Sequence, residues 1–149
     1  MALTIANILF DTSVIIAAIM ESHPKHLVSL LWIQKVKKAK IEGIISSHSL
    51  IEIYSVLTTF PLSPKISPAV AWKLIRENII KDFEIITYKR NDYLSILNEL
   101  VENQVSGGSS YDSLIAYSIE KTKVDKILTL NSRDFIRVKP EAANIIAEP

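Results

Sequence analysis

Four carboxylates stand where an expected strand ends or an expected helix begins. They are Asp11 in F-D-T-S, Glu52 in S-L-I-E-I-Y, Asp112 in S-Y-D-S-L-I-A and Asp134 in N-S-R-D-F. In an open α/β sheet, the carboxyl ends of the strands and the adjoining helix starts line one crevice, so we expect these acids to converge. Converging carboxylates repel one another unless a cation binds among them, and Mg²⁺ and Mn²⁺ prefer hard oxygen ligands. The pattern therefore predicts a divalent-metal site.

Neighbouring polar residues suit the same chemistry. Thr12 and Ser13 directly follow the first acid, so their hydroxyls could hydrogen-bond to a ligand carboxylate or to a phosphate. Arg133 stands beside Asp134, and a guanidinium so close to the expected crevice is a candidate phosphate ligand. Asn131 directly follows the fourth expected strand, whereas Asp134 comes three positions later. Both residues are therefore expected at the carboxyl edge of the sheet.

Short apolar segments alternate with helical patterns along the chain. We expect strands at residues 7–10, 43–46, 84–87 and 126–129, and a short edge strand at 144–147. We expect helices at about residues 13–21, 25–40, 47–60, 69–82, 91–103 and 111–122, and a proline-containing loop at 61–68. This alternation favours a three-layer α/β/α fold with a central, mainly parallel sheet of four to five strands. In such a sheet the expected ends of the first and fourth strands meet at one edge, where the helix of Asp112 also begins.

Length and composition predict one soluble domain, residues 1–149. Of the 149 residues, 48% are hydrophobic, which is enough to bury a single core. No apolar run approaches the roughly 18 residues of a membrane span, and the absence of cysteine suits a reducing compartment, so we expect a cytoplasmic protein. A net charge of +1 gives no global field for capturing nucleic acid, so any such binding depends on local groups and bound metal.

Each acid also has a purely structural interpretation. Asp11 could cap the helix that follows it. Asp112 could belong to a capping box that starts at Ser109, and Asp134 to a turn that starts at Asn131. The glutamate of S-L-I-E-I-Y could be solvated, because the polar face of its helix could point into the crevice or at solvent.

Together the motifs resemble those of the PIN-domain nucleases, and especially of the VapC-type toxins of type II toxin–antitoxin systems. The resemblance runs through D-T-S-V-I, S-L-I-E-I-Y, Y-D-S-L-I-A-Y-S-I-E and the closing I-L-T-L-N-S-R-D-F. It implies a PIN-like fold and an endoribonuclease that uses Mg²⁺ or Mn²⁺ as its cofactor. It also implies an RNA substrate, a cognate VapB-like antitoxin and a homodimer.

The resemblance assigns roles to the acids residue by residue. Asp11, Glu52 and Asp112 match the first three acids of the family. Members of the family can have the fourth acid at the place of Asn131, whereas here the acid is Asp134. The resemblance therefore implies that the catalytic and metal-binding residues are Asp11, Glu52, Asp112 and Asp134. It leaves open whether the site binds one metal ion or two.

Other functional classes fit the sequence less well. The only glycines are Gly43, Gly107 and Gly108, so neither a P-loop nor a dinucleotide-binding fingerprint is present. The histidines His23, His26 and His48 lack a metal-binding spacing, and we expect them to be surface or locally hydrogen-bonded residues. The alternatives are a non-catalytic PIN-like module that binds RNA or protein, and a receiver-like signalling domain.

Overall fold

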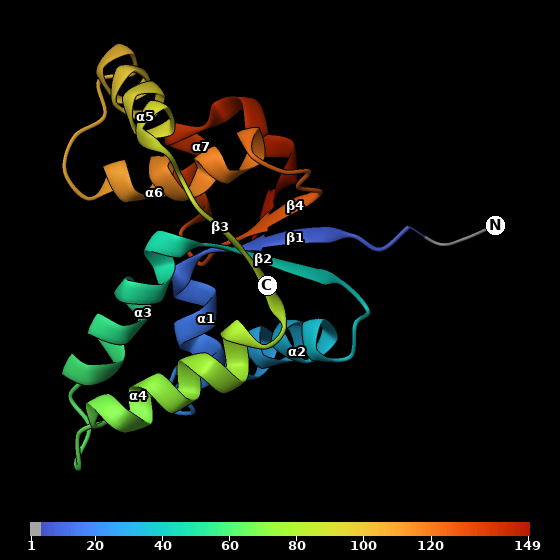
Figure 1. The fold of residues 1–149 in the computed structure, drawn as a ribbon, viewed down its shortest axis with the longest axis vertical. Helices are drawn as coiled ribbons and strands as arrows, with labels where there is room; N and C mark the ends of the chain where they lie inside the picture. The colour runs from blue at the N-terminus through green and yellow to red at the C-terminus, as the bar shows by residue number, and fades with distance from the viewer. Residues whose placement is uncertain (1–3) are drawn as a thin grey trace.

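A five-stranded parallel sheet forms the centre of the structure (Figure 1). The computed structural model describes residues 4–149, and its strands are β1 (Asn7–Phe10), β2 (Glu42–Ser46), β3 (Phe83–Ile86), β4 (Lys126–Leu128) and β5 (Ile146–Ala147). Their order across the sheet is β3-β2-β1-β4-β5, and every neighbouring pair is parallel. The predicted α/β fold with a parallel sheet of four to five strands is confirmed.

Both faces of the sheet are buried, which explains why its strands are continuous apolar runs. Leu9 lies in register between Ile44 and Ile127, and these side chains belong to the core on one face. Phe10 and Leu128, which are also paired in register, belong to the core on the opposite face. Alternating residues of each strand thus contribute to two separate cores.

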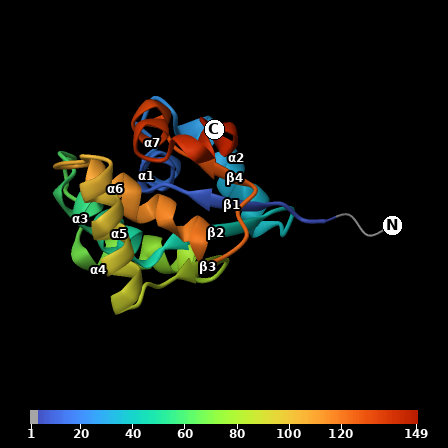
Figure 2. The same cartoon turned by 90° about the horizontal axis from the view of Figure 1, so that it is seen from above.

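Helices cover both faces, which gives the expected three layers (Figures 1 and 2). One layer contains α1 (Thr12–Ile19), α2 (His26–Lys37), α3 (Ser47–Thr59) and α4 (Pro68–Ile75), which continues into the π-helical turn η1 (Arg76–Ile80). The other contains α5 (Arg90–Glu102), α6 (Ser109–Ala116), the 3-10 turn η2 (Tyr117–Glu120), α7 (Ser132–Val138) and the 3-10 turn η3 (Pro140–Ile145). No helix within residues 4–149 is long and apolar enough to cross a membrane.

The helices differ from the sequence expectations mainly at their ends and after β4. Residues 132–138 form α7, where a turn was expected, because Phe135 and Val138 lie one turn apart and are both buried. A helix of 7 residues is too short to show a clear apolar periodicity in the sequence. The helix expected at 111–122 begins two residues earlier, at Ser109, and tightens to 3-10 geometry at Tyr117.

The strand order excludes one of the alternatives and locates the crevice. A receiver-like domain of the flavodoxin type has the order 2-1-3-4-5, which this sheet does not have. In the observed order, the chain leaves β1 toward β2 on one side and later returns to β4 on the other. Ligands of open α/β sheets bind where the order reverses in this way, beyond the carboxyl ends of the strands. The ends of β1 and β4 therefore mark the expected binding site.

Gly43 is needed where β2 passes under the ring of Phe83. A Cβ at this position would lie 2.7 Å from Cε1 of Phe83 and 2.9 Å from Cγ1 of Val36. The Phe83 ring packs edge-on against Phe10, with the ring centroids 5.1 Å apart, so it has little freedom to move. Close packing here leaves no room for a methyl group.

We predict that Gly43→Ala lowers the free energy of unfolding by about 1–3 kcal/mol, because the added methyl group overpacks the core. Gly108→Ala is the matched control, since a Cβ there would meet open space and φ is −61°. We expect the control to change stability by less than about 0.5 kcal/mol. Urea denaturation of both variants measures the difference, and equal midpoints would contradict the packing argument.

Candidate metal centre

Asp11 lies at the carboxyl end of β1, where the strand order reverses. Its carboxylate is buried, with 3% of the residue exposed. Oδ2 accepts hydrogen bonds from Ser13 Oγ at 2.5 Å and from Thr129 Oγ1 at 2.9 Å. Asp11 occupies the N-cap position of α1, but its side chain makes no capping hydrogen bond. Asp11 is thus the N-cap residue by position only, and its side chain is held toward the end of β4 by Thr129.

Burial raises the pKa of the Asp11 carboxyl, because the charged form loses its hydration. The hydroxyls of Ser13 and Thr129 stabilise the charged form and offset part of this effect. No cation forms an ion pair with this carboxylate within residues 4–149. The negative charge of Asp11 is thus poorly compensated.

The two hydroxyl residues after Asp11 connect three elements. Ser13 Oγ accepts a hydrogen bond from the backbone N of Leu130 at 3.1 Å while it donates to Asp11, so it joins α1 to the segment after β4. Thr12 Oγ1 donates to Ser49 Oγ at 2.9 Å, and both residues are buried. Thr12 therefore fixes the start of α3, which contains Glu52. Both residues support the crevice, but only Ser13 contacts the carboxylate of Asp11.

Glu52 projects from α3 beside His48, one turn earlier on the same face. Oε2 of Glu52 lies 3.2 Å from Nε2 of His48. Burial raises the pKa of Glu52, the charge of Asp11 raises it further, and His48 opposes both effects. His48, on the same face of α3, stacks on Tyr111 of α6, and Glu52 is partly buried, so the polar face of α3 points toward the crevice. The purely solvated alternative is therefore wrong.

Asp112 lies in the first turn of α6, opposite α3. The helix starts after Gly108 without a side-chain cap, so the alternative of a capping box that starts at Ser109 is wrong. Partial burial raises the pKa of Asp112 to about 7, and the charges of Asp11, Asp134 and Glu52 contribute in that order. Asp112 is thus the acid whose pKa is raised by the charges of all three other acids.

Asp134 lies in the first turn of α7, at the exposed rim of the crevice. Its side chain is 52% exposed, and its Oδ1 lies 3.7 Å from Nη2 of Arg137. Asn131 is the N-cap residue of α7 but makes no side-chain capping hydrogen bond, so the capping interpretation fails here too. The Asp134 charge nevertheless reaches Asp112.

The four acids are electrostatically coupled without forming a closed metal cage. Within residues 4–149, no three acidic or histidine side chains are grouped closely enough to hold an ion as they stand. Mg²⁺ retains several waters and is usually bound by one or two carboxylates plus phosphate. An all-oxygen set of carboxylates, only partly compensated by Arg137 and His48, around a buried aspartate fits such an ion by its chemistry.

A family comparison agrees with this arrangement. The model of the PIN domain matches residues 8–140. The chain belongs to the PIN-domain family.

Known proteins similar to this PIN domain are ribonucleases by name. It is 27% identical to Ribonuclease VapC27 of Mycobacterium tuberculosis over 115 residues, which cover 77% of this chain and 78% of the relative. It is also 27% identical to Ribonuclease VapC40 of the same species over 124 residues, which cover 83% and 85% of the two chains. The PIN domain is thus a distant homologue of the mycobacterial VapC ribonuclease toxins.

A solved structure has the same fold. The crystal structure of Mycobacterium tuberculosis VapC20, a Sarcin-Ricin loop cleaving toxin, superposes with a TM-score of 0.62 at 14% identity. The superposition covers 80% of this chain and 86% of that one. At this identity, the likeness concerns the fold alone.

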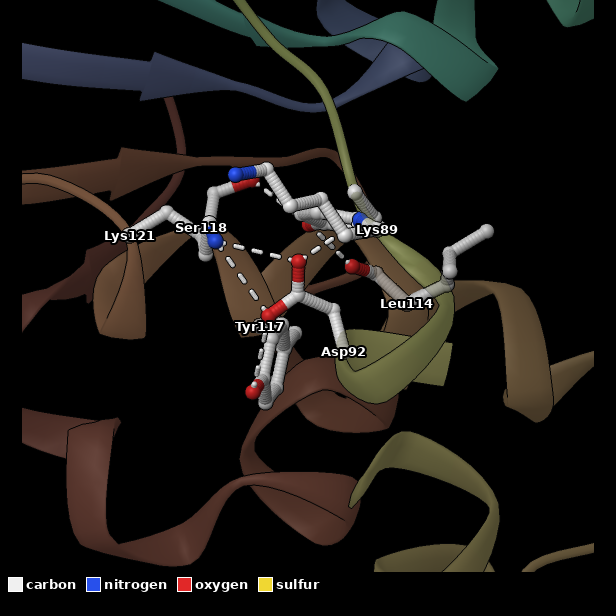
Figure 3. A network of polar contacts seen from close by, with 7 residues as sticks. Lys89, Asp92, Leu114, Tyr117, Ser118 and Lys121 are labelled. Atoms are coloured by element: carbon white, nitrogen blue, oxygen red, sulfur yellow. Dashed lines mark hydrogen bonds and ion pairs between the residues drawn. The ribbon is translucent and has the colours of Figure 1, made fainter. Parts of the chain in front are cut away.

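A polar network behind α6 holds the helix of Asp112 in place (Figure 3). Lys121 Nζ pairs with the carboxylate of Asp92 on α5 at 3.0 Å, and the Tyr117 hydroxyl donates to the same carboxylate at 3.4 Å. The hydroxyl of Tyr88, which follows β3, donates to the Leu114 carbonyl at 2.5 Å. The network therefore connects α6 and η2 to α5 and to the end of β3.

Sequence reasoning missed several residues of the site. Arg137, rather than Arg133, is the cation whose charge lowers the pKa of Asp112, and it donates to Ser109 Oγ at 2.5 Å. Arg133 is exposed and has no ion pair within the described chain. The i,i+3 spacing of Asp134 and Arg137 would have shown this pair once residues 132–138 were recognised as helical.

Thr129 and His48 had weaker signals in the sequence. Thr129 is a polar residue in the apolar run I-L-T-L-N at the end of β4. His48 precedes Glu52 by four positions on one helix, a spacing that places the two side chains in contact. The expectation that His48 is locally hydrogen-bonded agrees with this contact.

The raised pKa values predict that the metal-free protein loses stability as the pH rises. Between about pH 4, the ordinary pKa of aspartate, and about 7, the value for Asp112, the folded protein binds more protons than the unfolded chain. The free energy of unfolding therefore falls as pH increases through this window. Asp11 and Glu52 act in the same direction. In EDTA, we expect a lower Tm at pH 8 than at pH 5.5 by thermal denaturation.

Asp112→Asn should reduce this pH dependence, because an amide cannot become charged. We expect it to raise the Tm at pH 8 in EDTA by a few degrees, which corresponds to about 1 kcal/mol after solvent screening. Glu84→Gln, an exposed acid on β3, is the control and should retain the slope of the unmodified protein. An Asp112→Asn variant with an unchanged slope would show that Asp112 does not carry the coupling.

Proposed function

We propose that this PIN domain, residues 1–149, is a metal-dependent endoribonuclease that hydrolyses phosphodiester bonds of RNA. The observation that carries the proposal is the gathering of four poorly compensated carboxylates around the buried Asp11, where partial burial and the charges of the other three acids raise the pKa of Asp112 to about 7. The names of the homologous VapC ribonucleases support the same activity.

Asp11, Glu52, Asp112 and Asp134 are the proposed catalytic and metal-binding residues, with Mg²⁺ or Mn²⁺ as the cofactor. When bound, such an ion neutralises charge on the phosphoryl oxygens and lowers the pKa of an attacking water. Asp11 is the proposed central ligand, oriented by the Ser13 and Thr129 hydroxyls.

Other side chains around the crevice have supporting roles in this proposal. Thr12 fixes α3, so that Glu52 faces Asp11. Arg137 is the better candidate for a phosphate contact than Arg133, since it already lies beside Asp134 and Ser109. Asn131 is the remaining candidate for the position of the fourth acid.

We further propose a toxin that is neutralised by a VapB-like antitoxin, acts in the cytoplasm and forms a homodimer. Exposed apolar side chains on α2 support a partner surface, since Leu27 and Leu31 are 73% and 58% exposed. The absence of cysteine from the chain suits a reducing compartment.

The separation of the acids favours a second candidate, a PIN-like RNA- or protein-binding module without catalysis. The two functions differ in their response to metal. A catalytic site gains stability when Mg²⁺ or Mn²⁺ relieves its repulsion, because an ion that binds the folded state raises its Tm. A non-catalytic module would cleave no RNA with either ion present.

We predict that Asp11→Asn and Asp112→Asn each reduce RNA cleavage to background, because an amide keeps the shape but removes the charge that binds an ion. Neither variant should unfold, since loss of one charge relieves repulsion among the rest. The measurement is cleavage of transfer, ribosomal and messenger RNAs by purified protein in Mg²⁺ or Mn²⁺. The control Glu84→Gln should retain full activity, and unmodified rates in either aspartate variant would refute the catalytic assignment.

We predict that Asp134→Asn weakens metal binding about ten-fold or more, whereas Asn131→Ala leaves it unchanged. Asn131 is exposed and makes no capping hydrogen bond, so its loss should alter stability by less than about 0.5 kcal/mol. Calorimetric titration of Mn²⁺ into both variants decides the matter. The opposite ranking would assign the fourth ligand to Asn131.

A further inference from the structure

Two aromatic rings are stacked across the mouth of the acidic crevice. The rings of His48 and Tyr111 are nearly parallel, with an interplanar angle of 7° and centroids 5.1 Å apart. His48 stands one turn before Glu52 on α3, and Tyr111 directly precedes Asp112 on α6. Figures 1 and 2 show α6 beside the start of α3. The stack therefore joins two walls of the crevice at the level of the carboxylates.

Tyr111 remains open to solvent in spite of this contact. The residue is 54% exposed, whereas the side chain of His48 is 30% exposed. Since nearly parallel rings with centroids 5.1 Å apart are offset, His48 covers only part of the Tyr111 ring, and much of the residue stays accessible to a ligand. His48 is itself held by its contact with Glu52 at 3.2 Å. Tyr111 is thus a supported flat surface beside the crevice.

Other exposed aromatic rings in the described chain lack this combination. Tyr93 packs edge-on against Tyr88, with an interplanar angle of 76°. Trp72 lies on α4, in the opposite helical layer, with the Arg76 guanidinium 5.9 Å from its ring centroid. Neither of these rings adjoins one of the four acids in the sequence.

We propose that Tyr111, supported by His48, is a nucleobase-stacking subsite that holds an unpaired base next to the scissile phosphate of an RNA substrate. The inference rests on the proposed ribonuclease function, and it specifies that the substrate is single-stranded at this point. A base inside a duplex is covered by its neighbours, whereas an unpaired base offers its face to an aromatic side chain. Such stacking tolerates all four bases.

The electrostatics of the crevice explain why stacking is needed. Phosphate contacts usually dominate the affinity for nucleic acid. Here the net charge is only +1, and without a metal ion the four acids of the crevice repel phosphate. A stacked base supplies binding energy that depends little on charge. It also brings the adjacent phosphate close to the acids, because His48 contacts both the Tyr111 ring and the Glu52 carboxylate.

The test is the binding of a single-stranded hexaribonucleotide that contains 2-aminopurine, whose fluorescence is quenched on stacking. Titrations in EDTA measure binding without cleavage, and Mg²⁺ or Mn²⁺ is then added to measure KM and kcat. We expect Tyr111→Leu, which keeps an apolar side chain, to abolish the quenching, weaken binding about ten-fold and raise KM more than it lowers kcat. Tyr111→Phe and Tyr111→Trp should retain both signals. Trp72→Ala, which removes an exposed ring outside the crevice, should behave as the unmodified protein.

Outcomes for the subsite and for the ribonuclease function are distinguishable. Quenching that is lost in Tyr111→Leu but present in Tyr111→Phe supports the subsite, even if no variant cleaves RNA. Cleavage by the unmodified protein together with an unchanged KM and unchanged quenching in Tyr111→Leu overturns the subsite and leaves the ribonuclease function intact. Absence of quenching in the unmodified protein, or equal losses in Tyr111→Leu and Tyr111→Phe, also overturns it.

Discussion

The burial of one carboxylate at the centre of the sheet edge determines the character of this site. Asp11 follows β1, the middle strand, so it lies where helices from both layers approach the same edge. Removing a carboxylate from water is costly unless hydrogen bonds replace its hydration. The hydroxyls of Ser13 and Thr129 supply two such bonds. They stabilise the charge without neutralising it, and this remaining charge acts on the surrounding acids.

Two walls of the crevice belong to opposite layers of the fold. Glu52 is on α3, below the sheet in Figure 1, and Asp112 is on α6, above it. Each helix is held in place by contacts that do not involve the acid itself. The hydrogen bond between Thr12 and Ser49 holds α3, and the network around Asp92 holds α6. Arg137 is the cation that opposes the raised pKa of Asp112, and it sits at the solvent-exposed rim. These contacts therefore hold the acids in position without neutralising their negative charge.

The electrostatic repulsion within the site reduces the free energy of unfolding of the metal-free protein. Repulsion among the carboxylates lowers the stability of the metal-free form above the pKa of Asp112, and the two apolar cores on either side of the sheet compensate for it. Such a compromise between stability and function is common, because natural proteins need only remain above a stability threshold. Relief of the repulsion by a cation then couples metal binding to folding stability.

The sequence by itself determined the order of strands and helices and the positions of the four acids along it. Apolar periodicity and turn residues act over a few positions, so strands 7–10 and 126–129 and the acids after them were recognisable locally. The parallel sheet followed from the alternation of strands and helices. Helix α7 was missed because its 7 residues contain too few apolar positions to show a period.

Only the tertiary structure decided which side chains meet. The hydrogen bond between Asp11 and Thr129 joins residues 118 positions apart, and it depends on the register of β1 with β4. The stack of His48 on Tyr111 likewise depends on how α3 and α6 pack around the sheet edge. The pKa of Asp112 depends on burial and on four other charges at once, three acidic and one basic. Local sequence patterns cannot encode these quantities, because each is a property of distances between segments that become neighbours only on folding.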